Sequence, residues 1–156
     1  MIVQDVQEFK HRLKKEQRIL GIDYGEKNIG IALSDTRRKI ATPFKIIQSK
    51  GMQQDAISII GFLEEMDAGG VVIGFPLNMN GTEGERCRAT RAFVKHITLL
   101  DECPVLLWDE RLSTKAVEDC MIGGNMSRKK RKKNVDKVAA TYILQGVLDC
   151  LSLHSE

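Results

Sequence analysis

The chain has 156 residues, of which 42% are hydrophobic and 29% are charged, and this is the balance of one folded domain with a sizeable core. It has no apolar run as long as a membrane span and no hydrophobic signal segment near its polar start, so we expect a cytoplasmic protein with no membrane contact. The cysteines fit that compartment, because their wide spacing suits neither a zinc site nor a disulfide framework. They are Cys87, Cys103, Cys120 and Cys150.

The formal net charge of +3 hides an asymmetry along the chain. A run of six consecutive cations stands in an otherwise mildly acidic sequence, and it consists of Arg128, Lys129, Lys130, Arg131, Lys132 and Lys133. Such a block often binds a polyanion, but it can also be a solvated loop without a partner. Charge alone leaves both interpretations open.

The first third of the chain predicts a short helix and three strands. Residues 1–17 carry apolar side chains at helical spacing among charges, which predicts a short helical N-terminal extension. Apolar runs over about 18–23, 28–34 and 39–47 are separated by short glycine or charged turns. This spacing predicts an antiparallel meander of three strands.

The rest of the chain alternates between helices and strands. A helix is expected after Gly51, ending at Gly69 and Gly70, and "VVIGF" then has the composition of a buried parallel strand. A second helix should begin at the capping-box pattern Thr82–Glu85, and "VLLW" should form the last strand. A short helix from Ser113, a basic loop and a final helix from about Asn134 follow. The order predicts an α/β domain over residues 18–156, with a five-stranded mixed sheet flanked by helices.

Three carboxylates stand at the ends of these elements. Asp23 ends the first strand, Glu110 follows the last strand, and Asp136 heads an otherwise apolar stripe of the final helix. If the first and last strands are parallel, Asp23 and Glu110 lie at the same edge of the sheet, where open α/β sheets bind ligands. Each acid also has a plain structural interpretation. In these, Asp23 accepts hydrogen bonds from the following turn, Glu110 pairs with Arg111, and Asp136 accepts hydrogen bonds from helix N-terminal amides.

Taken together, the three acids favour a metal site. Carboxylates gathered in one place repel one another unless cations lie between them, and hard oxygen ligands suit Mg²⁺ or Mn²⁺. A pair of such ions activates water and stabilises the leaving oxygen of a phosphodiester.

Other polar residues are expected at the same edge. Asn78, in a Pro/Gly/Asn loop, either contacts the substrate backbone or only shapes the loop. Arg111 either clamps a phosphate or pairs with Asp109. Thr114 and Lys115 stand at a helix start, where backbone amides favour anions.

Four segments carry a resemblance to a known family: "LGIDYGEKNIGIALSD", "VVIGFPLNMNGTEG", "LLWDERLSTKAVE" and "KKRKKNVDKVAATYILQGVLD". They resemble the motif blocks of the YqgF (RuvX) family, small bacterial nucleases of the ribonuclease H-like, Holliday-junction-resolvase-like group. The resemblance runs from Arg18 to about Asp149, with the blocks in family order and spacing. It implies a ribonuclease H-like sheet and puts Asp23, Glu110 and Asp136 at the family's metal-binding acids. Asn28 stands where many relatives carry arginine, which puts one phosphate contact in question but not the metal site.

The resemblance further implies work on nucleic acid in the cytoplasm, with processing of the 5′ end of pre-16S rRNA as the leading function. Ribosomal precursor particles are then expected partners, and the chain is expected as a monomer or weak homodimer. Three alternatives stay open: a resolvase of branched DNA, a non-catalytic RNA-binding module of ribosome assembly, and a phosphotransferase of the actin-like kinase class. The kinase class shares the opening strand, aspartate and glycine turn, but it needs two related domains and this chain has room for one.

Overall fold

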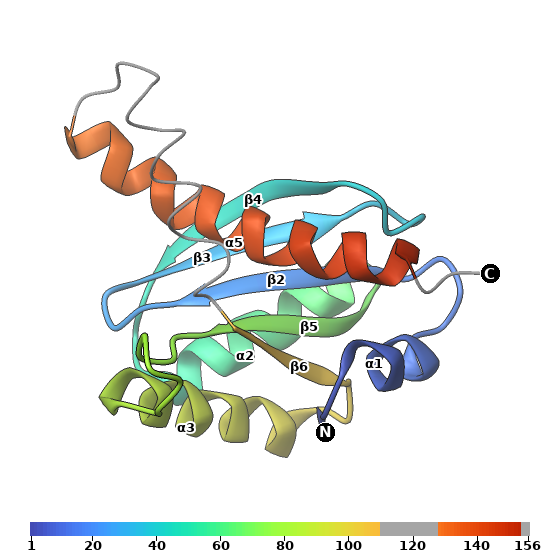
Figure 1. The fold of residues 1–156 in the computed structure, drawn as a ribbon, viewed down its shortest axis with the longest axis horizontal. Helices are drawn as coiled ribbons and strands as arrows, with labels where there is room; N and C mark the ends of the chain where they lie inside the picture. The colour runs from blue at the N-terminus through green and yellow to red at the C-terminus, as the bar shows by residue number, and fades with distance from the viewer. Residues whose placement is uncertain (110–127, 154–156) are drawn as a thin grey trace.

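The protein folds around one mixed β-sheet with helices on both faces (Figure 1). The computed structural model describes residues 1–109 and 128–153, and it describes side chains over 1–109 and 139–152. The strands are β1 (Ile2–Val3), β2 (Arg18–Tyr24), β3 (Asn28–Ser34), β4 (Ala41–Gln48), β5 (Ala68–Phe75) and β6 (Val105–Asp109). The described helices are α1 (Val6–Arg12), α2 (Met52–Glu65), α3 (Glu85–Leu100) and α5 (Arg128–Leu153). None of these described helices is long and apolar enough to cross a membrane.

The strand order is β1-β6-β5-β2-β3-β4, and it confirms the mixed sheet that the sequence predicts. Strands β2, β3 and β4 form the antiparallel meander, whereas β5 and β6 run parallel to β2. Ile22 pairs with Ile73, and Ile73 pairs with Leu107, so the three parallel strands are in step. Their carboxyl ends therefore meet at one edge of the sheet, which we call the carboxyl rim.

The prediction of five strands was wrong by one, because Ile2 and Val3 add the parallel strand β1 beside β6. Two residues are too short to show a strand period, and the pairing depends on a partner about a hundred positions away in sequence. Helix α1 follows, with Asp5 as its N-cap, and buries Phe9 completely. The first residues of the chain thus contribute both to the sheet and to the core.

The two faces of the sheet carry separate cores because side chains alternate along each strand. Leu20 and Ile22 of β2 pack under α2 and α3, whereas Ile19 packs under α5. Helix α5 lies across β2, β3 and β4, as Figure 1 shows. Ile143 and Val147 of α5 are fully buried against that face.

The boundaries of two helices differ from the prediction. Helix α3 begins at Glu85 with Gly84 as N-cap and no side-chain cap, so the capping box at Thr82 does not form. The Thr82 hydroxyl instead donates to Asn80 Oδ1 at 2.6 Å, because a neighbouring side chain in the loop competes for it. Helix α2 ends at Glu65, before the glycine pair, since Asp67 adopts the left-handed conformation that makes the turn.

Helix α5 begins at Arg128, so the six cations are the first turns of a helix and not a loop. Lysine and arginine lose little side-chain freedom in a helix, and their propensity favours this outcome. Further along α5, the Tyr142 side chain is 42% exposed.

Candidate functional site

Asp23 is the member of the predicted trio whose side chain the structure describes. It is the penultimate residue of β2, pairs with Gly30 of β3, and is half-buried at the carboxyl rim. It lies two residues after Gly21, on the face of the sheet that α5 covers. The turn that follows is tight, because a Cβ atom on Gly25 would lie 2.6 Å from the Asn28 carbonyl oxygen. A strand that ends in a tight turn therefore holds Asp23 at the rim.

Gly21 lets the backbone of α5 approach β2 just behind Asp23. A Cβ atom at Gly21 would lie 2.7 Å from Leu144 Cβ and 3.0 Å from the Ala140 carbonyl oxygen. Helix α5 runs antiparallel to β2, so its earlier residues extend toward the carboxyl rim (Figure 1). Asp136 stands one turn before Ala140, which corresponds to a rise of about 6 Å. Its backbone lies in α5, whereas its side chain lies outside the described residues.

Strand β6 ends at the same rim. Asp109 pairs with Phe75 at the last step of the sheet, and Trp108 pairs with Gly74. The Trp108 ring packs 3.5 Å from the position that a Cβ atom of Gly146 would take, so it faces α5 as Asp23 does. Glu110 follows Asp109 in the sequence but lies outside the described residues, as do Arg111, Thr114 and Lys115.

The loop after β5 reaches the rim, and Asn78 closes it. Asn78 Nδ2 donates to Thr82 Oγ1 at 3.0 Å, and the backbone amide of Asn78 donates to the Thr82 carbonyl at 2.9 Å. Asn78 therefore shapes the loop, while its side chain remains exposed. The substrate contact stays a prediction beside this structural role.

An ion pair fastens the far end of that loop to α3. Arg91 Nε donates to Glu83 Oε1 at 2.6 Å, and this hydrogen bond lowers the pKa of the Glu83 carboxyl. The Arg91 guanidinium also lies 4.8 Å from the ring centroid of Phe75, the last residue of β5. The pair is exposed to solvent, so it serves to orient the loop more than to stabilise the fold.

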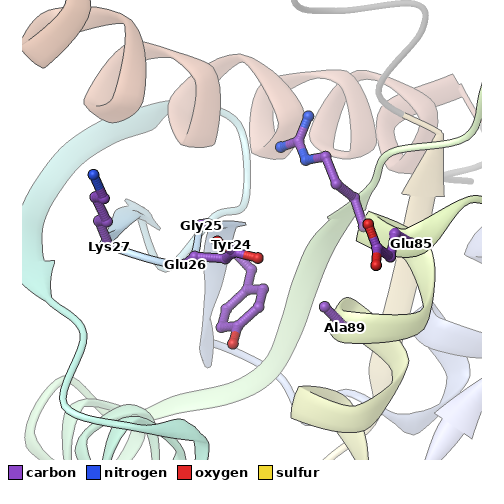
Figure 2. A pocket seen from close by; sticks show the side chains of 7 residues that line it. Tyr24, Gly25, Glu26, Lys27, Glu85 and Ala89 are labelled. Carbon is purple, nitrogen blue, oxygen red and sulfur yellow. The ribbon is translucent and has the colours of Figure 1, made fainter.

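A pocket of about 510 Å³ opens at the rim between the β2–β3 turn and the start of α3 (Figure 2). Figure 2 shows Tyr24 and Lys27 on one side and Glu85 and Ala89 on the other. The lining residues are Tyr24, Gly25, Glu26, Lys27, Glu85, Arg86 and Ala89. Sequence reasoning missed this pocket, because its two sides are about sixty positions apart in the chain.

Tyr24 gives the pocket an aromatic wall next to Asp23. Its ring stacks on Phe93 of α3 with 4.4 Å between centroids and 16° between planes. Burial raises the pKa of Tyr24, and the carboxylates of Asp55 and Glu26 raise it further. The Tyr24 hydroxyl therefore remains a neutral hydrogen-bond donor at physiological pH.

The predicted metal site combines Asp23 with Glu110 and Asp136, whose side chains lie outside the described residues. Within residues 1–109 and 139–152, no three His, Cys, Asp or Glu side chains gather in a way that could hold a metal ion. Asp23 supplies the hard oxygen donor that Mg²⁺ and Mn²⁺ prefer, at the carboxyl rim. The donor chemistry of Asp23 thus fits a divalent ion.

The sheet order and the helices on both faces define a ribonuclease H-like fold, and solved structures of that class match it. Thermus thermophilus RuvC in complex with a Holliday junction substrate has a TM-score of 0.54 at 10% identity, covering 86% of this chain and 96% of that one. The yeast mitochondrial Holliday junction resolvase has a TM-score of 0.51 at 11% identity, covering 96% and 86%. At 10% and 11% identity, the similarity between this chain and these two structures concerns the fold alone.

The family follows from sequence similarity over nearly the whole chain. The RuvX family model, described as Holliday junction resolvase, matches residues 17–150. A Methylocella silvestris protein named as a candidate pre-16S rRNA nuclease is 50% identical over 147 residues, covering 94% of this chain and 91% of that protein. A Ruegeria pomeroyi protein of the same name is 43% identical over 151 residues, covering 97% and 98%. The chain belongs to the RuvX (YqgF) family, a family of nucleases, and the resemblance in the four motif blocks is confirmed.

Proposed function

We propose that this protein is a metal-dependent nuclease that hydrolyses phosphodiester bonds in structured nucleic acid. The observation that carries the proposal is Asp23, a carboxylate at the carboxyl end of β2 on the face covered by α5. The names of the relatives support pre-16S rRNA as the substrate. We place the action at the 5′ end of that RNA, in the cytoplasm and within ribosomal precursor particles. The protein would act there as a monomer or a weak homodimer.

We further propose that Asp23, Glu110 and Asp136 together bind Mg²⁺ or Mn²⁺. Strand β5 separates β2 from β6, so these two strands lie about 10 Å apart at the rim. Trp108 pairs with Gly74, which is one residue beyond Ile73, the partner of Ile22. Glu110 follows two positions after Trp108 in the sequence. Such a span suits carboxylates that flank a metal pair roughly 3.5–4 Å apart.

The residues of the chain have distinct parts in the proposed reaction. When bound, the divalent ions supply charge stabilisation to the phosphate and a reactive water. Asp23, at the end of β2, would hold its carboxylate in place as a ligand for these ions. Arg111, Thr114, Lys115 and Asn78 are proposed to contact neighbouring phosphates and orient the strand.

Cleavage assays on three substrates test the proposed function. Purified protein is incubated with a pre-16S rRNA 5′ leader, a four-way DNA junction and unstructured single-stranded RNA, each with Mg²⁺, Mn²⁺ or EDTA. We expect metal-dependent cleavage of the leader and none in EDTA. Preferential cutting of the DNA junction would instead favour the resolvase alternative, which the family description supports. Binding without cutting under every condition would favour the non-catalytic module.

The six cations at the start of α5 give a second prediction. They begin just over two turns before Asp136 in the same helix, so they should neutralise substrate phosphates and release counterions. Replacing Lys129, Lys130, Lys132 and Lys133 by glutamine should weaken RNA binding and flatten its salt dependence, by about 0.7 in log–log slope per lost contact. Fluorescence anisotropy of a leader RNA at several salt concentrations measures this slope. An unchanged slope would mean that the run contacts no phosphate.

A further inference from the structure

A second cluster of cations lies at the opposite end of the sheet from Asp23. It surrounds a cavity of about 110 Å³ and joins α1, the β3–β4 turn and the last turn of α5. The lining residues are Lys10, Arg37, Arg38, Lys39, Leu151 and Ser152. The four cations among them form what we call the distal basic cluster. Among the residues that the structure describes, no acidic side chain lines the cavity.

Two carboxylates on the segments that carry this cluster make hydrogen bonds within those segments. Burial alone would raise the pKa of Asp35, but hydrogen bonds from the amides of Ile40 and Lys39 outweigh it and lower the pKa. The Asp35 carboxylate therefore serves the β3–β4 turn. Asp149 accepts a hydrogen bond from Gln145 Nε2 at 2.9 Å. The described lining of the cavity itself carries four cations, Lys10, Arg37, Arg38 and Lys39.

Hydrogen bonds hold the cluster in place. Arg38 has a left-handed backbone with φ of 57°, and its guanidinium donates to the carbonyl oxygens of Gln17 and Lys14. Lys39 Nζ donates to Ser152 Oγ at 3.2 Å. Arg38 is thus a brace that ties the β3–β4 turn to the segment before β2. A preformed cluster loses little conformational entropy when an anion binds.

The distance between the carboxyl rim and the distal basic cluster sets how long a nucleic acid must be to contact both. Asp23 pairs with Gly30, and the five steps of β3 from Gly30 to Asp35 span about 17 Å. From Lys133 to Ser152, helix α5 rises about 28 Å. Since phosphates of one strand in a duplex repeat about every 3.4 Å, these spans correspond to roughly five to eight phosphates.

We propose that the distal basic cluster binds the phosphate backbone of the substrate several nucleotides away from the cleaved bond. The inference rests on the proposed nuclease function, because it assigns the ligand to the same nucleic acid. The enzyme would then gain affinity from substrates long enough to extend from the rim to the far end of α5. A short substrate would engage the rim alone and bind more weakly.

A length series of RNAs tests the proposal. The triple variant Lys10→Gln, Arg37→Gln, Lys39→Gln keeps the Arg38 brace. Its affinity for hairpin RNAs with stems of about 5 and about 25 base pairs is measured by anisotropy in EDTA, which separates binding from cleavage. We expect about a tenfold loss for the long RNA, a salt slope flatter by about 2 to 3, and little change for the short RNA.

A matched control removes the same charge elsewhere. Lys50, Arg88 and Lys95 are exposed, before α2 and on α3, and their triple glutamine variant should bind both RNAs as the wild type does. Equal losses in the two triple variants, or equal losses for the two RNAs, would overturn the proposal. If the distal variant melts at a lower temperature, Arg37→Glu alone replaces it, because Arg37 is exposed. Wild-type protein that binds with this length dependence but never cuts would refute the nuclease proposal alone.

Discussion

The Asp23→Asn protein is expected to fold normally and to lose metal-dependent cleavage. The amide keeps the shape of the side chain but removes the negative charge that attracts a divalent cation. Metal ions contribute several kcal/mol to the stabilisation of a phosphoryl transition state, so the rate should fall by about 1000-fold or more. Single-turnover cleavage of the leader RNA measures this loss, and thermal unfolding verifies the fold.

Asp35 provides the matched control for this variant. Asp35 is also an aspartate next to a strand end, but it lies at the opposite end of the sheet and caps a turn. Asp35→Asn should therefore retain the cleavage rate while losing some stability. If folded Asp23→Asn cleaves as fast as the wild type, Asp23 does not belong to the catalytic site.

Replacing Gly21 by alanine should both destabilise the protein and slow cleavage. The added Cβ would meet Leu144 Cβ at 2.7 Å and the Ala140 carbonyl oxygen at 3.0 Å. No change of rotamer moves either atom, so α5 itself has to shift. Overpacking of this kind costs about 1–3 kcal/mol in the free energy of unfolding. Because α5 carries Asp136, its shift should also lower the cleavage rate at temperatures where the variant is folded.

Gly61→Ala is the control for this substitution. Gly61 lies in α2, and a Cβ atom there would meet nothing within 4 Å. Alanine should stabilise the helix by up to about 1 kcal/mol and leave cleavage unchanged. Denaturant unfolding of both variants measures the difference. Equal stability of the two variants would show that α5 does not press on β2 at Gly21.

The sequence predicted most of the fold because its periodicities are strong and local. The meander from Arg18 to Gln48 follows from alternating apolar residues between short turns, and the structure confirms it. Strand β1 could not be predicted, because it exists only through pairing with β6. The start of α5 differs from the prediction, because a run of like charges is typical of a solvated loop, whereas helix propensity favours lysine and arginine.

The part of Asp23 in a metal site stays a prediction, but its place near the end of an apolar strand, before the turn at Gly25, was predictable. The pocket at Tyr24 and the distal basic cluster were not, because each joins segments that only the fold brings together. Gly21 likewise gave no signal, since its role depends on α5 crossing the sheet above it.

The location of bound Mn²⁺ tests the metal site most directly. Crystals grown with Mn²⁺ give an anomalous signal that marks each ion independently of any assumption about the ligands. The account predicts ions at the carboxyl rim, with Asp23, Glu110 and Asp136 oxygens at about the 2.0–2.6 Å typical of hard divalent cations. Ions bound away from Asp23, or an Asp136 side chain on the opposite face of the sheet, would contradict it.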